Sequence, residues 1–216
     1  MSDEALLIRG RLIQRRVVGA FGLLFPFVLV AASFLAGARE LLPSLSAYYG
    51  DAGARDLYVG IQFTTAWFFF SYQGHDRRDR VAGKLAWAST LLVALVPSTT
   101  DNQLASDIHF WAATAEFLVL AYFSLFLFTE TGPDGPSPQK LIRNRIYRIC
   151  GWIMIAILTL AMLYYVLLAG KGTWVDDYRP IFVLETGALL AFGFSWIVKG
   201  ETLWKDQEPV PVPVPA

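Results

Sequence analysis

A short polar stretch between two apolar runs carries one of the few concentrations of catalytically capable side chains in this chain. It extends from Pro97 to Glu116 and reads PSTTDNQLASDIHFWAATAE. His109 and Glu116 are seven residues apart, so on a helix they share one face about two turns apart. Glu185 falls one to two turns into a later apolar run, measured from the end expected on the same side. These groups at similar depth could bind a ligand, act in catalysis or hold a metal ion.

An ionisable side chain inside an apolar segment is costly, so it usually faces the interior of a helix bundle and marks function. For Glu116 and Glu185 three interpretations stay open. Each could be a buried acid bonded to a neighbouring helix or paired with Arg55 or Arg179, part of a ligand or lipid-headgroup pocket, or part of a catalytic or metal site. The candidate residues are, for catalysis, His109, Glu116 and Glu185; for ligand binding, Asp101, His109, Glu116, Glu185 and Arg179; and for a metal, Asp101, His109 and Glu116.

Residue counts exclude several other classes of site. The expected topology separates the two histidines, His75 and His109, by the thickness of a membrane, so one chain cannot build a three-histidine zinc site. A single cysteine, Cys150, excludes an internal disulfide and a thiolate metal cluster. Patterns of the G-x-S-x-G, HExxH and P-loop type are absent from the sequence. The formal net charge of zero leaves no basic excess to neutralise the phosphates of a nucleic acid.

The composition predicts membrane-spanning helices. The chain is 55% hydrophobic and only 17% charged, whereas charged residues near a quarter are usual in soluble domains. Several apolar runs approach the ~20 residues that cross a bilayer core, where only helices or closed barrels satisfy every backbone polar group. We therefore predict an all-α bundle, a single domain over residues 1–205 followed by a Pro/Val-rich tail at 206–216. The predicted spans are 17–38, 57–72, 81–96, 108–128, 146–169 and 181–198.

The distribution of basic residues predicts the orientation of these spans. With six spans, 14 of the 18 Lys and Arg residues fall on the side of the two termini and four on the other side. Basic residues gather on the cytoplasmic side, so both termini are predicted to be cytoplasmic. The three loops predicted to face outward are 39–56, 97–107 and 170–180.

The first span has an alternative interpretation. Ala36, Gly37 and Ala38 resemble the small-residue cleavage site of a secretory signal peptide. The apolar run is long for such a peptide and further membrane segments follow it, so a retained span is favoured.

Small residues predict where the helices approach each other. Gly187 and Gly193 in the sixth span, and Ala112 and Ala115 at the start of the fourth, would let two backbones come close. We therefore expect the fourth and sixth spans to touch near the outer face, which would bring their glutamates together.

Several phrases occur together in a familiar order. They are SAYYGDAGARDLYVG before the second span, FSYQGHDRRD after it, ALVPST ending the third, the outward-facing His109, RNRIYRICG opening the fifth and WIVKGE closing the sixth. The pattern resembles uncharacterised bacterial multi-span membrane proteins, broadly of the DUF998 or Frag/DRAM type, over most of the chain. The resemblance implies a six-helix bundle with no established activity, and it adds no catalytic residue.

These observations favour a non-enzymatic, multi-pass protein of the bacterial inner membrane. It is expected to bind a lipid or small molecule in an outward-facing polar pocket, with membrane lipids as partners, no nucleic acid, and a homo-oligomer as a further expectation. No cofactor is expected, although a divalent metal would suit the candidate ligands. The alternatives are a metal-dependent, membrane-embedded hydrolase acting on a lipid, and a transporter or channel subunit.

Overall fold

The computed structural model describes residues 3–72, 74, 76–98, 100–132 and 135–205, and every regular element in them is helical. The predicted all-α class is therefore confirmed. The 3-10 helices η1 (Ser46–Gly50) and η3 (Trp174–Tyr178) lie in loops, and the π-helical turn η2 (Phe123–Leu127) extends the fourth long helix. The predicted tail at 206–216 and His75 lie outside the described residues. The long helices are α1 (Asp3–Leu35), α2 (Arg55–Phe70), α3 (Arg77–Leu95), α4 (Gln103–Tyr122), α5 (Pro138–Leu167) and α6 (Pro180–Lys199).

Four of these helices are long and apolar enough to cross a membrane, namely Ala5–Leu35, Gln103–Leu127, Pro138–Leu167 and Pro180–Lys199. The helix α2 has 16 residues, or about 24 Å, which is shorter than a bilayer core of about 30 Å. The helix α3 begins with the charged sequence RRDR, and these residues lower the mean hydropathy of the helix. A membrane protein is thus supported by length and composition, while the six-span count stays a prediction.

Both α1 and α5 begin earlier than the apolar runs that predicted them. The helix α1 already begins at Asp3 and α5 at Pro138, so residues expected in a polar terminus and a polar loop are helical. Arg, Lys and Gln are strong helix formers, and an apolar run does not by itself mark where a helix begins. Ser137 fixes the start of α5, because its Oγ accepts a hydrogen bond from the Lys140 backbone N–H at 3.0 Å.

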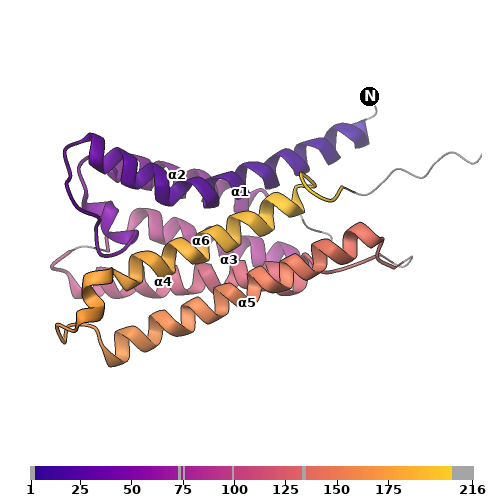
Figure 1. The fold of residues 1–216 in the computed structure, drawn as a ribbon. Coiled ribbons are helices and arrows are strands. Elements are labelled where there is room, and N and C mark those ends of the chain that lie inside the picture. The colour runs from indigo at the N-terminus through magenta and orange to yellow at the C-terminus, as the bar shows by residue number, and fades with distance from the viewer. Residues whose placement is uncertain (1–2, 73, 75, 99, 133–134, 206–216) are drawn as a thin grey trace, which may run out of the picture.

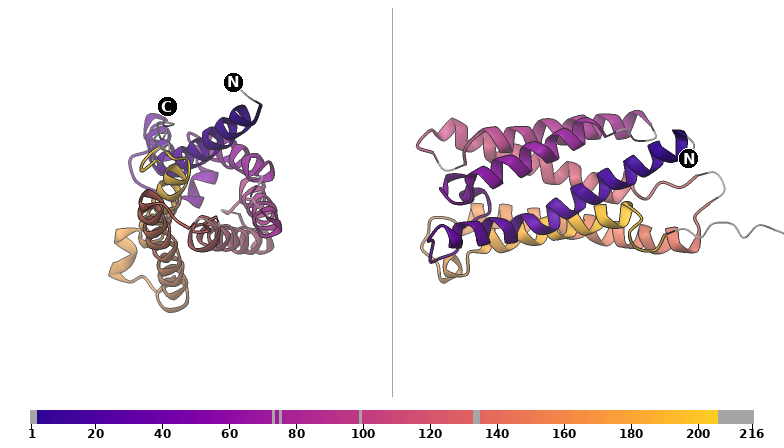
Figure 2. Two further views of the ribbon diagram at one scale, coloured as in Figure 1. Left: turned by 90° about the vertical axis from the view of Figure 1, so that its right-hand side faces the viewer. Right: turned by 90° about the horizontal axis from the view of Figure 1, so that it is seen from above.

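The six long helices form a ring in which each packs against the next along the chain, and α6 closes the ring against α1 (Figures 1 and 2). Successive helices alternate in direction. The segments η1 and η3 therefore lie together at one end of the bundle, on the left in Figure 1, which we call the loop end. The helix α1 begins and α6 ends at the opposite end, which we call the termini end.

The helices α1 and α6 pack closely against each other, and this packing depends on glycine. A Cβ on Gly193 would lie 2.6 Å from the Leu23 backbone nitrogen and 2.7 Å from the Gly19 carbonyl oxygen. A Cβ on Gly19 would lie 2.7 Å from the Ile197 nitrogen. Glycine lets membrane helices pack backbone to backbone in this way. The helix α6 also contacts α4, as predicted. Gly193, however, lies against the backbone of α1 rather than against α4.

An aromatic cluster around the fully buried Trp196 fills the bundle toward the termini end. The outer surface instead exposes many large apolar side chains, such as Leu35 and Val166, which suits contact with lipid. The rings whose centroids lie 5.2–5.7 Å from that of Trp196 belong to Phe69, Tyr72, Phe123 and Phe128.

Candidate functional site

A small internal cavity near the loop end lies between α2, α4 and α6, beside η1; we call it the carboxylate cavity. Its volume is about 40 Å³. His109 and Glu116 line it from α4 and Glu185 from α6, so the structure brings together three of the five predicted ligand-binding residues. The other lining residues are Phe25, Leu45, Ser46, Tyr58, Gln62, Val93, Ala113, Phe117 and Leu189.

Glu116 links α4 to α3. Its side chain is buried, with 7% of the residue exposed, and its Oε1 accepts a hydrogen bond from the Thr90 hydroxyl at 2.8 Å. Thr90 is fully buried. A buried carboxylate with one neutral donor retains lone pairs for a further partner, because an ionised carboxylate offers about four acceptor positions.

Glu185 links α6 to the connection between α1 and α2. Its Oε2 accepts a hydrogen bond from the Leu45 backbone N–H at 2.6 Å, directly before η1. In the described part of the chain no ion pair joins it to Arg55 or Arg179. Arg55 instead lies over the Tyr49 ring, 5.3 Å from its centroid. The pairing considered from the sequence is thus not the one found.

His109 contributes an acceptor to the cavity. Only 3% of the residue is exposed, and its Nδ1 lies 2.7 Å from the Val96 carbonyl oxygen. A carbonyl can only accept, so we assign the proton to Nδ1, and the neutral ring then carries a lone pair on Nε2. Nε2 is buried and has no hydrogen-bond partner among the described residues. A buried polar atom without a partner is uncommon, so His109 Nε2 is a candidate contact for a ligand.

Two predicted ligand-binding residues lie elsewhere. Asp101 lies in the exposed connection between α3 and α4 and does not line the cavity. Arg179 lies before α6 and pairs with Glu40 at 3.1 Å. The proposed metal set of Asp101, His109 and Glu116 is therefore divided between the loop and the cavity.

Sequence reasoning missed the polar groups that α2 and α3 contribute. Tyr58 and Gln62, one turn apart on α2, both line the cavity, and Thr90 holds Glu116 from α3. Gln62 could have been found as an amide inside an apolar run. Nothing in the sequence marks Thr90 or Tyr58, because their role depends on how each helix is rotated about its axis.

The loop that brings Leu45 to Glu185 is held by its own polar contacts. Asp51 accepts a hydrogen bond from the Gly53 backbone N–H at 2.9 Å and from the Ser33 hydroxyl at 2.8 Å. Tyr48 is fully buried within η1, and this burial raises the pKa of its phenol above the ordinary value. Leu45 and Ser46 of this loop form part of the cavity wall.

Within the described ranges, no group of three or more His, Cys, Asp or Glu side chains is placed to hold a metal ion, so a divalent metal stays a prediction. Comparison with known protein families, curated proteins and solved structures gives no match for this chain. The resemblance to the DUF998 or Frag/DRAM type likewise stays a prediction. What the residues offer chemically is a small cavity lined by several hydrogen-bond acceptors.

Proposed function

We propose that this chain is a multi-pass membrane protein that binds a small cation, of the size of sodium or ammonium, in the carboxylate cavity. The observation that carries the proposal is that Glu116, Glu185 and His109 line one small cavity, and that His109 Nε2 has no hydrogen-bond partner among the described residues. These three side chains do not form a complete metal site by themselves, and Tyr58 and Gln62 line the same cavity. The side chains of Glu116, Glu185 and His109 all present hydrogen-bond acceptor atoms, which favour a ligand that is positively charged or donates hydrogen bonds.

The volume of the carboxylate cavity supports a ligand that is smaller than a lipid. A water molecule needs roughly 10–15 Å³ of such volume, so about 40 Å³ accommodates a few non-hydrogen atoms. A lipid headgroup or acyl chain exceeds that volume. Of the two ligands expected from the sequence, the small molecule is therefore favoured over the lipid.

The burial of the Glu116 and Glu185 carboxylates supports a cationic ligand. Removing a carboxylate from water is costly unless it is paired, and the donors to these glutamates are neutral: a hydroxyl for Glu116 and the backbone N–H groups of Leu45 and Ser46 for Glu185. A cation between them would offset that cost for both groups. Tyr58 and Gln62 would complete the coordination with oxygen atoms, which hard cations prefer.

The proposal includes a bacterial inner membrane, cytoplasmic termini and an outward-facing loop end. The strong bias of Lys and Arg toward the termini end supports the orientation, with cytoplasmic termini and an outward-facing loop end. A homo-oligomer, contacts with membrane lipids, a hydrolase activity and a role as a transporter subunit stay predictions.

Thermal unfolding in neutral detergent tests the proposal. Sodium or ammonium chloride should raise Tm relative to choline chloride at equal ionic strength, because ligand at 100 times its Kd stabilises by about 2.7 kcal/mol. Glu116→Gln and Glu185→Gln should lose that increase. Asp101→Asn, an exposed acid outside the cavity, is the matched control and should keep it. Equal Tm values in all three salts for the wild-type protein would overturn the proposal.

A further inference from the structure

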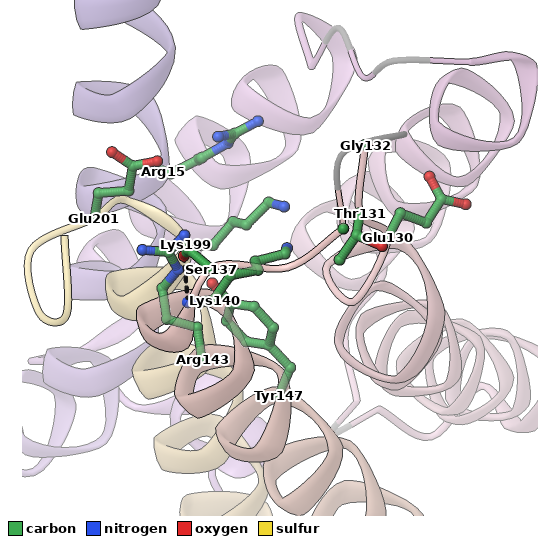
Figure 3. Close-up of a pocket in the computed structure, with 11 residues that line it drawn as sticks. Arg15, Glu130, Thr131, Gly132, Ser137, Lys140, Arg143, Tyr147, Lys199 and Glu201 are labelled. Carbon is green, nitrogen blue, oxygen red and sulfur yellow. Dashed lines mark hydrogen bonds between the residues drawn. The ribbon is translucent and has the colours of Figure 1, made fainter. Parts of the chain in front are cut away.

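A second, larger pocket lies at the termini end, far along the bundle from the carboxylate cavity. Its volume is about 380 Å³, within the range of small-molecule sites. Figure 3 shows its lining side chains, which come from α1, α5, α6 and the segment that leads into α5. The polar groups that matter are Arg15, Ser137, Lys140, Arg143, Tyr147 and Lys199.

Two ammonium groups of this pocket converge on one backbone carbonyl. Lys140 Nζ donates to the Phe128 oxygen at 2.8 Å, and Lys199 Nζ lies 3.5 Å from the same oxygen. Both groups also lie within 6 Å of the Tyr147 ring centroid, at 5.8 Å and 5.9 Å. In Figure 3 they point into the same space. Like charges this close repel each other, so the arrangement favours an anion between them.

Basic residues outnumber acidic ones among the described residues that line the pocket, although the nearby Asp79 carboxylate also attracts Lys199. Glu130 pairs with Arg78 at 2.7 Å, outside the basic group. No carboxylate lies within 4.0 Å of Lys199 in the part of the chain that the structure describes. Glu201 is the other acidic residue of the lining, set against four basic ones.

The remaining basic residues come from helices that are fixed by the fold. Arg143 is 4% exposed and donates to the Trp204 carbonyl oxygen, which holds it at the wall of the pocket. Arg15 reaches the pocket from α1. The amino-terminal end of α5, capped by Ser137, adds the partial positive charge of a helix dipole.

We propose that this pocket binds a phosphate group. Guanidinium forks and ammonium groups are the donors that proteins use for phosphate, and hydroxyls of Ser137 and Tyr147 supply further donors. The phosphate belongs either to the headgroup of an anionic phospholipid or to a soluble phosphate compound. Both share the same chemistry, and the pocket lies where helices end, so either source can reach it.

The test uses full-length protein in neutral detergent, with sodium absent so that the carboxylate cavity does not contribute. One arm titrates inorganic phosphate against chloride at equal ionic strength. The other adds phosphatidylglycerol to the micelles, with phosphatidylcholine as the neutral comparison. Binding is read as the concentration-dependent rise in Tm.

Arg15→Gln and Lys199→Gln should each weaken binding by about tenfold or more, the usual effect of losing a charge-assisted hydrogen bond. Arg11→Gln, an exposed arginine on the same helix as Arg15, is the matched control and should bind as the wild type does. Circular dichroism shows whether each variant is folded. If either Arg15→Gln or Lys199→Gln fails to fold, the other variant alone carries the test.

A response to inorganic phosphate supports a soluble phosphate ligand, and a response to phosphatidylglycerol alone supports a lipid headgroup. Either response must be lost in the pocket variants. No rise in Tm in either arm, or a rise that is equal in Arg15→Gln, Lys199→Gln and the control, would overturn the proposal.

Discussion

Gly193→Ala should separate α6 from α1 and destabilise the bundle. The added methyl group would meet two backbone atoms of α1, the Leu23 nitrogen at 2.6 Å and the Gly19 oxygen at 2.7 Å. Backbone atoms cannot rotate away as a side chain can, so the helices must move apart along their contact. Overpacking of this kind costs about 1–3 kcal/mol, and each 1.4 kcal/mol is about tenfold in the folded-to-unfolded ratio.

Reversible unfolding by sodium dodecyl sulfate in mixed micelles measures this change, with helix content read by circular dichroism. Gly187→Ala is the matched control on the same helix. Its Cβ would lie 3.1 Å from the Ile157 Cδ1, the flexible end of a side chain that can move aside. The reasoning fails if Gly193→Ala unfolds at the same detergent fraction as Gly187→Ala.

Two further variants test polar contacts. Thr90→Val keeps the side-chain shape but removes the donor to Glu116, so it should cost about 1–3 kcal/mol in the same unfolding assay. Ser89→Ala, which loses only bonds to its own helix, should stay within about 0.5 kcal/mol, and equal losses would contradict the role given to Thr90. At the start of α3, a hydrogen bond from the Asp79 backbone N–H lowers the pKa of the Asp76 carboxyl. That cap is complete above the unfolded-state pKa and is lost as pH falls through the lower folded pKa, so the Asp79 amide resonance should titrate there in wild type but not in Asp76→Asn.

Apolar content and length were sufficient to predict the helical class and the approximate positions of the helices. The beginnings of α1 and α5 were not predictable from that signal, because polar residues such as those around Lys140 continue a helix as readily as apolar ones. Fewer helices than the predicted six are long and apolar enough to span a membrane, because α2 is short and α3 is charged at its start.

For the site, helical spacing placed His109 and Glu116 on one face, and depth from the helix ends suggested Glu185 as their neighbour. The structure brings these three together. Sequence alone could not find Thr90 or the Leu45 amide, because their contacts depend on helix rotation and on the path of a loop. The phosphate pocket was likewise hidden, since its basic residues come from three helices far apart in sequence.

Infrared difference spectroscopy tests the central claim most directly. The protein is held in a lipid film while the buffer is exchanged from choline chloride to sodium or ammonium chloride, and the carboxyl stretching bands are recorded. The account predicts reversible carboxylate bands on exchange that disappear in the Glu116→Gln and Glu185→Gln variants and persist in Asp101→Asn. Absence of any cation-dependent carboxylate band in the folded wild-type protein would contradict it.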